Sequence, residues 1–280
     1  MNYPQISICM ATYNGQEYLK EQIDSIFAQS NQDWQLLIRD DGSCDNTISI
    51  IEDYMAKFPD KIKLLTGRQC HLGASLNFGQ LLEYADTEYI MFSDQDDIWL
   101  PNKIELTLNI MKATEQLYPD RPVLVHTDLT VIDSDSRTIA DSIWSYQKLF
   151  PEIGNSLNKI TAQNVVTGCA MMINRKARAV SIPIPGEAIM HDWWIAIKVA
   201  KHGKIAYVST PSILYRQHPG NKIGAKKAQK INILHFLTKL CRLKKLLSAQ
   251  YKMVKKANPD ANLLSLVLNK ALIKIAQRCR

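Results

Sequence analysis

The sequence lacks the cysteine patterns that build disulfide frameworks and zinc sites. Its six cysteines are spread over 280 residues, with no C-x-x-C pair and no histidine at zinc-ligand spacing. No apolar run approaches the roughly 20 residues of a membrane-spanning helix. Residues 1–5 show neither the basic nor the apolar part of a signal peptide. These absences predict a protein of the reducing cytoplasm with no spanning segment.

Two further absences exclude classes of enzyme. No G-x-G-x-x-G follows the first predicted strand, which argues against a dinucleotide-dependent oxidoreductase. The chain also shows no Ser-His-Asp or Cys-His arrangement typical of a covalent catalyst.

Acidic residues are nearly absent from one part of the chain. Residues 226–280 hold 14 of the 34 Lys and Arg residues but only one acid, Asp260, a local balance of +13. The remainder has 20 basic against 26 acidic residues and a balance of −6. We therefore expect a mildly acidic body, residues 1–225, and a strongly basic helical tail, residues 226–280.

Hydrophobic periodicity predicts an α/β protein with a mostly parallel sheet and helices on both faces. Strands are expected over 6–13, 34–38, 61–65, 89–92, 123–131, 165–173 and 205–216. Helices are expected over 17–29, 48–58, 73–85, 103–118 and 191–200, with two basic amphipathic helices over 231–256 and 261–278. Residues 134–163, rich in Ser, Asn and Gln, are expected to form an exposed, mobile connection.

A cluster of carboxylates follows the apolar strand predicted over 89–92. Asp94 and Asp96 alternate along an extended chain, so both side chains can point the same way. Close carboxylates with no Lys or Arg in the run repel each other unless a cation neutralises them. Mg²⁺ and Mn²⁺ take oxygen ligands of this kind. The alternative is a solvated acidic turn.

Polar residues also follow the first two strands. Thr12, Tyr13 and Asn14 end the first strand, and Asp40-Asp41-Gly42-Ser43 ends the second. Since the carboxyl ends of parallel strands share one edge of the sheet, these groups can converge with Asp94 on one ligand. The simpler alternative for Asp40 and Asp41 is a turn that caps the next helix.

Taken in order and spacing, these motifs resemble family 2 glycosyltransferases of the GT-A fold. The resemblance covers roughly residues 5–218. It rests on Ala11-Thr12-Tyr13-Asn14-Gly15, Asp40-Asp41-Gly42-Ser43, Gly73-Ala74-Ser75-Leu76-Asn77, Asp94-Gln95-Asp96, Asn164-Val165-Val166-Thr167-Gly168-Cys169 and His191-Asp192-Trp193-Trp194. Three forms are most similar to bacterial rhamnosyltransferases, of hexosyltransferase type: Ser93-Asp94-Gln95-Asp96-Asp97-Ile98-Trp99, His191-Asp192-Trp193-Trp194 and Tyr215-Arg216-Gln217-His218. The subgroup resemblance implies L-rhamnose as the sugar and dTDP-rhamnose as the first donor to test.

The resemblance implies a role for each matching position. A nucleoside-diphosphate sugar would contact Thr12, Tyr13, Asn14, Asp40, Asp41, Asn77, Asp94 and Arg216. Asp94 and Asp96 would hold Mg²⁺ or Mn²⁺ against the diphosphate, with His218 as a further ligand. Asp192 would be the general base of an inverting, single-displacement transfer to a hydroxyl of a cell-surface glycan precursor. The acceptor side would involve Trp99, Gly168, His191 and Trp193.

Several of these residues have a simpler structural interpretation. Asp192 before two tryptophans is also a pattern for a helix N-cap, and His218 before Pro219 can be an ordinary loop histidine. His191 stands where many relatives have Glu, so either acceptor contact or packing fits it. Trp99, Trp193 and Trp194 could stack on a sugar or fill the core, and we expect at least one to line the acceptor cleft.

Two other functions compete with glycosyl transfer. A sugar-nucleotide-forming nucleotidyltransferase can share this fold and its metal carboxylates, but usually opens with a Gly-rich loop carrying Arg or Lys. A non-catalytic nucleotide- or nucleic-acid-binding protein would use the basic tail. The tail lacks the aromatic residues of single-strand binders, so we expect no nucleic-acid partner.

The tail has the pattern of a membrane-surface helix. Within 231–247, basic residues fall between apolar residues at three- and four-residue steps: Ile233, Phe236, Leu237, Leu240, Leu243 and Leu247. Such helices can lie on an anionic membrane, here the inner face of the cytoplasmic membrane, near a lipid-linked acceptor. The alternative is packing on the catalytic domain or on a second subunit. The sequence does not specify the oligomeric state.

Overall fold

The computed structural model describes residues 4–67, 69–221 and 236–278, with the backbone alone for 236–243. The strands are β1 (Ile6–Thr12), β2 (Trp34–Asp40), β3 (Ile62–Leu64), β4 (Tyr89–Ser93), β5 (Ile98–Trp99), β6 (Val123–Ile132), β7 (Thr138–Ala140), β8 (Met171–Asn174) and β9 (Lys204–Arg216). The helices are α1 (Leu19–Phe27), α2 (Thr47–Lys57), α3 (Ala74–Tyr84), α4 (Lys103–Leu117), α5 (Ile143–Gln147), α6 (Leu157–Ala162), α7 (Arg175–Ser181), α8 (His191–His202), α9 (Phe236–Ala257) and α10 (Leu263–Arg278). Two short 3₁₀ helices lie at Pro151–Asn155 and Gly168–Ala170.

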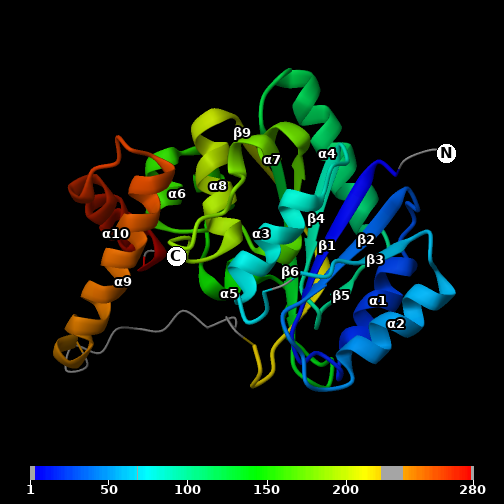
Figure 1. Cartoon of the computed structure of the whole chain (residues 1–280). Helices are drawn as coiled ribbons and strands as arrows, with labels where there is room; N and C mark the ends of the chain where they lie inside the picture. The colour runs from blue at the N-terminus through cyan, green and yellow to red at the C-terminus, as the bar shows by residue number, and fades with distance from the viewer. Residues whose placement is uncertain (1–3, 68, 222–235, 279–280) are drawn as a thin grey trace.

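One sheet runs through the described part of the chain in the order β3-β2-β1-β4-β8-β6-β9-β5, and helices flank it (Figure 1). The pairs β1–β2, β1–β4, β2–β3 and β6–β9 are parallel. Strands β1, β2 and β4 are almost wholly buried, as expected for apolar interior strands. The predicted α/β fold with a mostly parallel sheet is confirmed. Because β8 pairs antiparallel with both β4 and β6, the sheet is mixed at its centre.

The register of β1, β2 and β4 positions the polar strand ends. Thr12 pairs with Asp40, and Met10 pairs with Ser93, the residue before Asp94. The three motifs that follow these strands therefore lie at one edge of the sheet.

Two sequence predictions about the middle of the chain are wrong. Residues 134–163 form β7, α5, a 3₁₀ helix and α6 rather than a mobile connection, and Ile143, Trp144 and Ile160 lie in the core. Only part of 165–173 is strand, because a 3₁₀ helix over Gly168–Ala170 precedes β8. In both regions the buried apolar residues are too short a run to show a helical or strand period.

The C-terminal helices lie beside α6 and α8, on the opposite side of the molecule from α1 and α2 (Figure 1). Met253 and Val254 of α9 are buried, as are Leu266 and Ile273 of α10. The predicted break between the two helices at Asn258-Pro259 is confirmed. None of the described helices is apolar over enough length to cross a membrane. The division at residue 225 stays a prediction.

The apolar row predicted over 231–247 falls almost entirely outside the described residues. Ile233 is not described, and the side chains of Phe236, Leu237, Leu240 and Leu243 are not described either. Leu247 is half-buried and packs against the core.

Candidate active site

A cavity of about 440 Å³ opens at the edge of the sheet where β1, β2 and β4 end, beside the first turn of α8. It brings together nine of the residues predicted from the sequence: Thr12, Tyr13, Asp41, Asn77, Asp94, Asp96, Gly168, His191 and Asp192. The rest of its wall is formed by Ala11, His71, Gly73, Ala74, Phe78, Gln95, Thr167, Met190, Tyr215, Gly220 and Asn221. Among the described residues, no lysine or arginine lines it.

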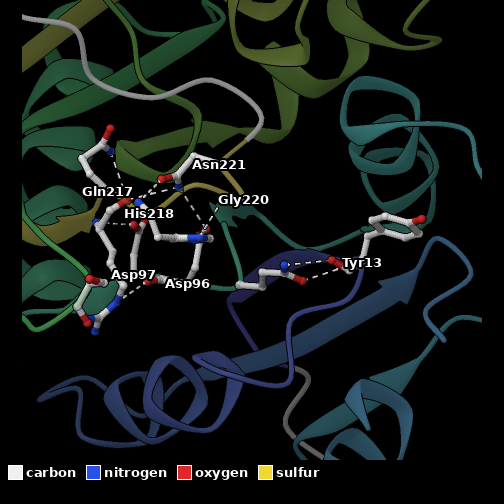
Figure 2. A network of polar contacts seen from close by, with 10 residues as sticks. Tyr13, Asp96, Asp97, Gln217, His218, Gly220 and Asn221 are labelled. Carbon is white, nitrogen blue, oxygen red and sulfur yellow. Dashed lines mark hydrogen bonds and ion pairs between the residues drawn. The ribbon is translucent and has the colours of Figure 1, made fainter. Parts of the chain in front are cut away.

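The two carboxylates after β4 face this cavity. Asp96 Oδ2 lies 2.8 Å from His218 Nε2 and accepts from Asn221 Nδ2 at 3.2 Å, and Figure 2 shows both side chains reaching Asp96. Burial, together with the negative charges of Asp96 and Asp192, raises the pKa of Asp94 to about 7. Neighbouring carboxylates that resist losing their protons favour a bound cation.

Asp94 and Asp96 on the cavity wall carry carboxylate oxygens, and His218, which contacts Asp96 but does not line the cavity, carries an imidazole nitrogen. These are donor types that Mn²⁺ and Mg²⁺ take. Among the described residues, however, the group whose ligand atoms all lie within 4.8 Å of one another is a different one. Deeper in the protein, single ligand atoms of Asp94, Asp97 and Cys169 lie within 4.8 Å of one another. Burial raises the pKa values of both Asp97 and Cys169, and the thiol sulfur of Cys169 is a softer ligand than a hard cation such as Mg²⁺ prefers.

Asp192 lies at the start of α8, on the cavity wall. Its carboxylate accepts from the backbone N–H of Gly168 at 3.1 Å, from Asn164 Nδ2 at 3.2 Å and from the backbone N–H of Trp193. Burial raises its pKa to about 7, although these three donors act in the opposite direction. A carboxylate with a pKa near neutrality can take a proton efficiently.

His191 lies between the cavity and the core. Its ring stacks on Phe78 at 4.0 Å between centroids, and only 2% of the residue is exposed. Neither ring nitrogen has a hydrogen-bond partner among the described residues, and burial lowers its pKa to about 3. The imidazole is therefore neutral. Gly168 fits against it closely, since a Cβ there would lie 2.8 Å from Nε2.

The opposite end of the cavity is built from β1, β2 and the segment before α3. Asp41 accepts from the backbone N–H groups of Leu72 and Gly73 at 2.9 and 2.7 Å, which ties that segment to β2. Tyr13 is half-exposed and meets His71 edge to face at 5.9 Å. Two rings at a cavity mouth offer flat surfaces for a planar ligand.

These features match a known group of proteins. A family model described as glycosyl transferase family 2 matches residues 7–180. The chain belongs to this family.

Individual relatives agree with the family. The dTDP-rhamnosyl transferase RfbG of Shigella flexneri is 30% identical over 224 residues, 77% of this chain and 74% of that protein. Among solved structures, S. aureus TarS 1–349 in complex with UDP has a TM-score of 0.62 at 16% identity, covering 96% of this chain and 70% of that chain. The mannosyltransferase PcManGT from Pyrobaculum calidifontis, in complex with GDP-Man and Mn²⁺, has a TM-score of 0.57 at 15% identity, covering 99% and 81%. The fold of this glycosyltransferase is thus GT-A.

Two predicted donor contacts have other roles in this family 2 glycosyltransferase. Asp40 accepts from the backbone N–H groups of Gly42 and Ser43, as well as from the hydroxyls of Thr12 and Ser43. Its oxygens are occupied by this turn, and it does not line the cavity. Asn14 likewise holds the turn, since its Oδ1 accepts from the backbone N–H of Cys44. The simpler turn interpretation of Asp40 is the one that the geometry favours.

Arg216 does not reach the cavity. Its side chain is 2% exposed and pairs with Glu21, donates to the Asp96 carbonyl at 3.0 Å and donates to Ser136 Oγ at 2.9 Å. Its backbone N–H donates to Asp97 Oδ1 at 3.1 Å. The guanidinium therefore fixes the end of β9 to the carboxylate loop, and it is not placed to contact a diphosphate.

The expectation that a tryptophan lines the acceptor cleft is not met in the structure. Trp99 is 2% exposed, with Lys103 Nζ 4.4 Å from its ring. Trp193 donates from Nε1 to the Ile160 carbonyl at 2.7 Å, and Trp194 donates to the Ser181 carbonyl at 2.7 Å. All three rings are used in packing, and none lines the cavity.

Sequence reasoning missed three polar cavity residues. Gln95 Oε1 accepts from the backbone N–H of Tyr13 at 2.8 Å, and its Nε2 donates to the Tyr13 carbonyl at 3.0 Å. This joins the ends of β1 and β4. His71 and Asn221 also lie on the wall. The place of Gln95 between two predicted ligands was a usable signal, whereas His71 and Asn221 lie in loops whose course the sequence does not specify.

Proposed function

We propose that this glycosyltransferase moves a sugar from a nucleoside-diphosphate donor, held in the cavity with a divalent cation, to an acceptor hydroxyl. The observation that carries the proposal is the makeup of one cavity wall. Asp94 and Asp96 face it beside Asp192, and no described lysine or arginine is present to neutralise a diphosphate. A cation on the two carboxylates would supply the missing positive charge.

The donor is proposed to be a dTDP-activated 6-deoxysugar, with dTDP-L-rhamnose first. Support comes from RfbG, a dTDP-rhamnosyl transferase by name, which matches over 77% of this chain. The nucleotide would lie between Tyr13 and Asp41, with Thr12 and Asn77 in the cavity wall. The structures of TarS with UDP-GlcNAc and of PcManGT with GDP-Man support a nucleotide sugar as the donor.

Asp94, Asp96 and His218 would hold Mn²⁺ or Mg²⁺. When bound, the cation supplies positive charge that offsets the charge on the departing diphosphate. Asp192 takes the proton from the acceptor hydroxyl, whose oxygen attacks the anomeric carbon opposite the diphosphate. The bond from that carbon to the diphosphate oxygen breaks, and a single displacement inverts the configuration. Gly168 and Asn164 hold the Asp192 carboxylate in position for this transfer.

The acceptor is proposed to be a glycan precursor carried on a lipid, at the inner face of the cytoplasmic membrane. The basic balance of residues 226–280 supports this location, because anionic lipid attracts positive charge. Of the four residues predicted for the acceptor side, His191 and Gly168 line the cavity.

A panel of nucleotide sugars tests the donor. Purified protein is incubated with dTDP-rhamnose, UDP-GlcNAc, UDP-glucose and GDP-mannose, and release of nucleoside diphosphate is measured with Mn²⁺ and with excess chelator. We expect the fastest release from dTDP-rhamnose, lost on chelation. Preference for another donor would refute the sugar assignment, and full activity with chelator would refute the metal assignment.

A further inference from the structure

Helix α10 presents a row of apolar side chains to solvent. Leu264, Leu268, Leu272 and Ile275 follow one another at steps of four, four and three residues, so they share one side of the helix. They are 65%, 53%, 63% and 58% exposed. Val267, at the edge of the same side, is 41% exposed. We call these five residues the α10 stripe.

The other side of α10 supplies the contact that this helix makes with the described part of the protein. Leu266 and Ile273 lie on the other side of the helix and are buried against the neighbouring helices. A contiguous apolar surface of this kind usually marks a site of interaction. Since the helix packs through this other side, the stripe is left exposed by the described residues of the chain.

The charges around the stripe indicate what that is. Lys274 and Arg278 are exposed on α10, which has no acidic residue, and Lys244, Lys245 and Lys252 are exposed on α9. Residues 226–280 as a whole carry a balance of +13. Pairing this surface with a second copy of itself would bring like charges together. An anionic lipid bilayer complements both the basic residues and the apolar stripe, because its headgroups are negatively charged and its interior is apolar.

We propose that the α10 stripe inserts into the interface of an anionic lipid bilayer, with the exposed basic residues of α9 and α10 on the lipid headgroups. Each basic residue near such a surface raises the binding constant about fivefold. The prediction from the sequence assigned membrane contact to the face over 231–247. Of that predicted row only Leu247 has a described side chain, and it packs against the core, whereas the exposed apolar row among the described residues is on α10.

Hydrogen bonds fix α9 and α10 to the part of the protein that carries the cavity. Gln250 of α9 donates to the carbonyls of Thr161 and Ala162 at 2.6 and 3.1 Å, and Lys270 of α10 donates to Gln250 Oε1 at 2.6 Å. Lys201 of α8, the helix that begins at His191, donates to Asn258 Oδ1 at 2.9 Å. These contacts would hold α8, which carries the proposed base Asp192, at a fixed distance from the membrane. This role rests on the proposed function, in which the acceptor is carried on a lipid.

Vesicle co-sedimentation of the full chain tests the inference. Vesicles of phosphatidylglycerol and phosphatidylcholine are compared with pure phosphatidylcholine at low salt. The stripe variant, Leu264→Gln, Leu268→Gln, Ile275→Gln, replaces three of the five stripe residues. The control variant, Leu117→Gln, Tyr84→Gln, Ile139→Gln, replaces three exposed apolar side chains elsewhere. We expect the stripe variant to bind anionic vesicles at least about tenfold more weakly, the loss expected when inserted leucine-sized groups are removed. The control variant should bind like the native protein.

Donor hydrolysis, measured without vesicles, separates this inference from the proposed function. The stripe variant should hydrolyse nucleotide sugar at the native rate, and this also shows that it is folded. Equal binding of native protein and stripe variant to anionic vesicles would overturn the inference. So would no binding by the native protein. A native dimer that the stripe substitutions convert to a monomer, with vesicle binding unchanged, would assign the stripe to a second copy instead.

Discussion

Replacing Asp192 by Asn should abolish transfer while leaving the donor bound. The carboxylate is held by the backbone N–H groups of Gly168 and Trp193 and by Asn164 Nδ2, and its pKa is raised to about 7 by burial. Asn has nearly the same shape but cannot accept the acceptor's proton. Loss of a general base costs about 10²–10⁴-fold in rate, or about 3–5 kcal/mol of transition-state stabilisation.

The pH dependence of the native enzyme follows from the same group. The raised pKa means that Asp192 is mostly protonated below about pH 7 and mostly ionised above it. The rate should therefore rise about tenfold per pH unit below neutrality and level off above it. Transfer is assayed at saturating donor and Mn²⁺, with donor affinity measured separately by titration calorimetry.

The control is Asp60→Asn, which replaces an exposed aspartate that does not line the cavity. It should keep native rates and the native pH profile. If donor affinity falls as much as the rate does in Asp192→Asn, the assignment of Asp192 as the base is refuted. The alternative, that Asp192 only caps the N-terminus of α8, would then be favoured. The base assignment would also be refuted if the transfer rate of Asp192→Asn rises with pH below neutrality in the same way as that of the native protein.

Three further predictions concern neighbouring residues. Asp96→Asn should lose most metal-stimulated hydrolysis, with Mn²⁺ affinity falling by calorimetry; unchanged Mn²⁺ affinity would contradict the ligand assignment. Since the pKa of Asp94 is raised to about 7, ionising it destabilises the metal-free folded protein as the pH rises from about 4 to 7. Asp94→Asn should therefore raise the Tm in chelator more at pH 8 than at pH 5, and an equal shift at both would refute this. Gly168→Ala should lower stability by about 1–3 kcal/mol, because the new Cβ meets His191 Nε2 at 2.8 Å. Denaturant unfolding measures this loss, which should be smaller in a His191→Ala background.

The sequence specified the catalytic edge of the fold well. Apolar strands ending in polar residues predicted β1, β2 and β4, and parallel pairing then required Thr12, Asp41 and Asp94 to share one edge. Asp192 could be predicted as a site residue because it belongs to the motif His191-Asp192-Trp193-Trp194, which does not depend on hydrophobic periodicity. These positions depend on local patterns that the sequence shows directly.

Side-chain direction could not be predicted in the same way. Arg216 stands two residues from His218, yet only His218 contacts the Asp96 carboxylate, because the guanidinium is bound by Glu21 and by backbone carbonyls, that of Asp96 among them. The three tryptophans are used in packing for a similar reason: Trp99 and Trp194 are buried in the core, and the partly buried Trp193 packs against it. Such outcomes depend on tertiary neighbours that are distant in the sequence.

A crystal structure with dTDP and Mn²⁺, using the anomalous signal of manganese, tests the central claim most directly. The account predicts one manganese peak bound by Asp94, Asp96 and His218 and touching the diphosphate, with the base near Tyr13 and Asp41. Asp96→Asn crystals soaked in parallel should show a weaker peak. Nucleotide bound away from this cavity, or a manganese ion on other ligands while the diphosphate occupies the cavity, would contradict it.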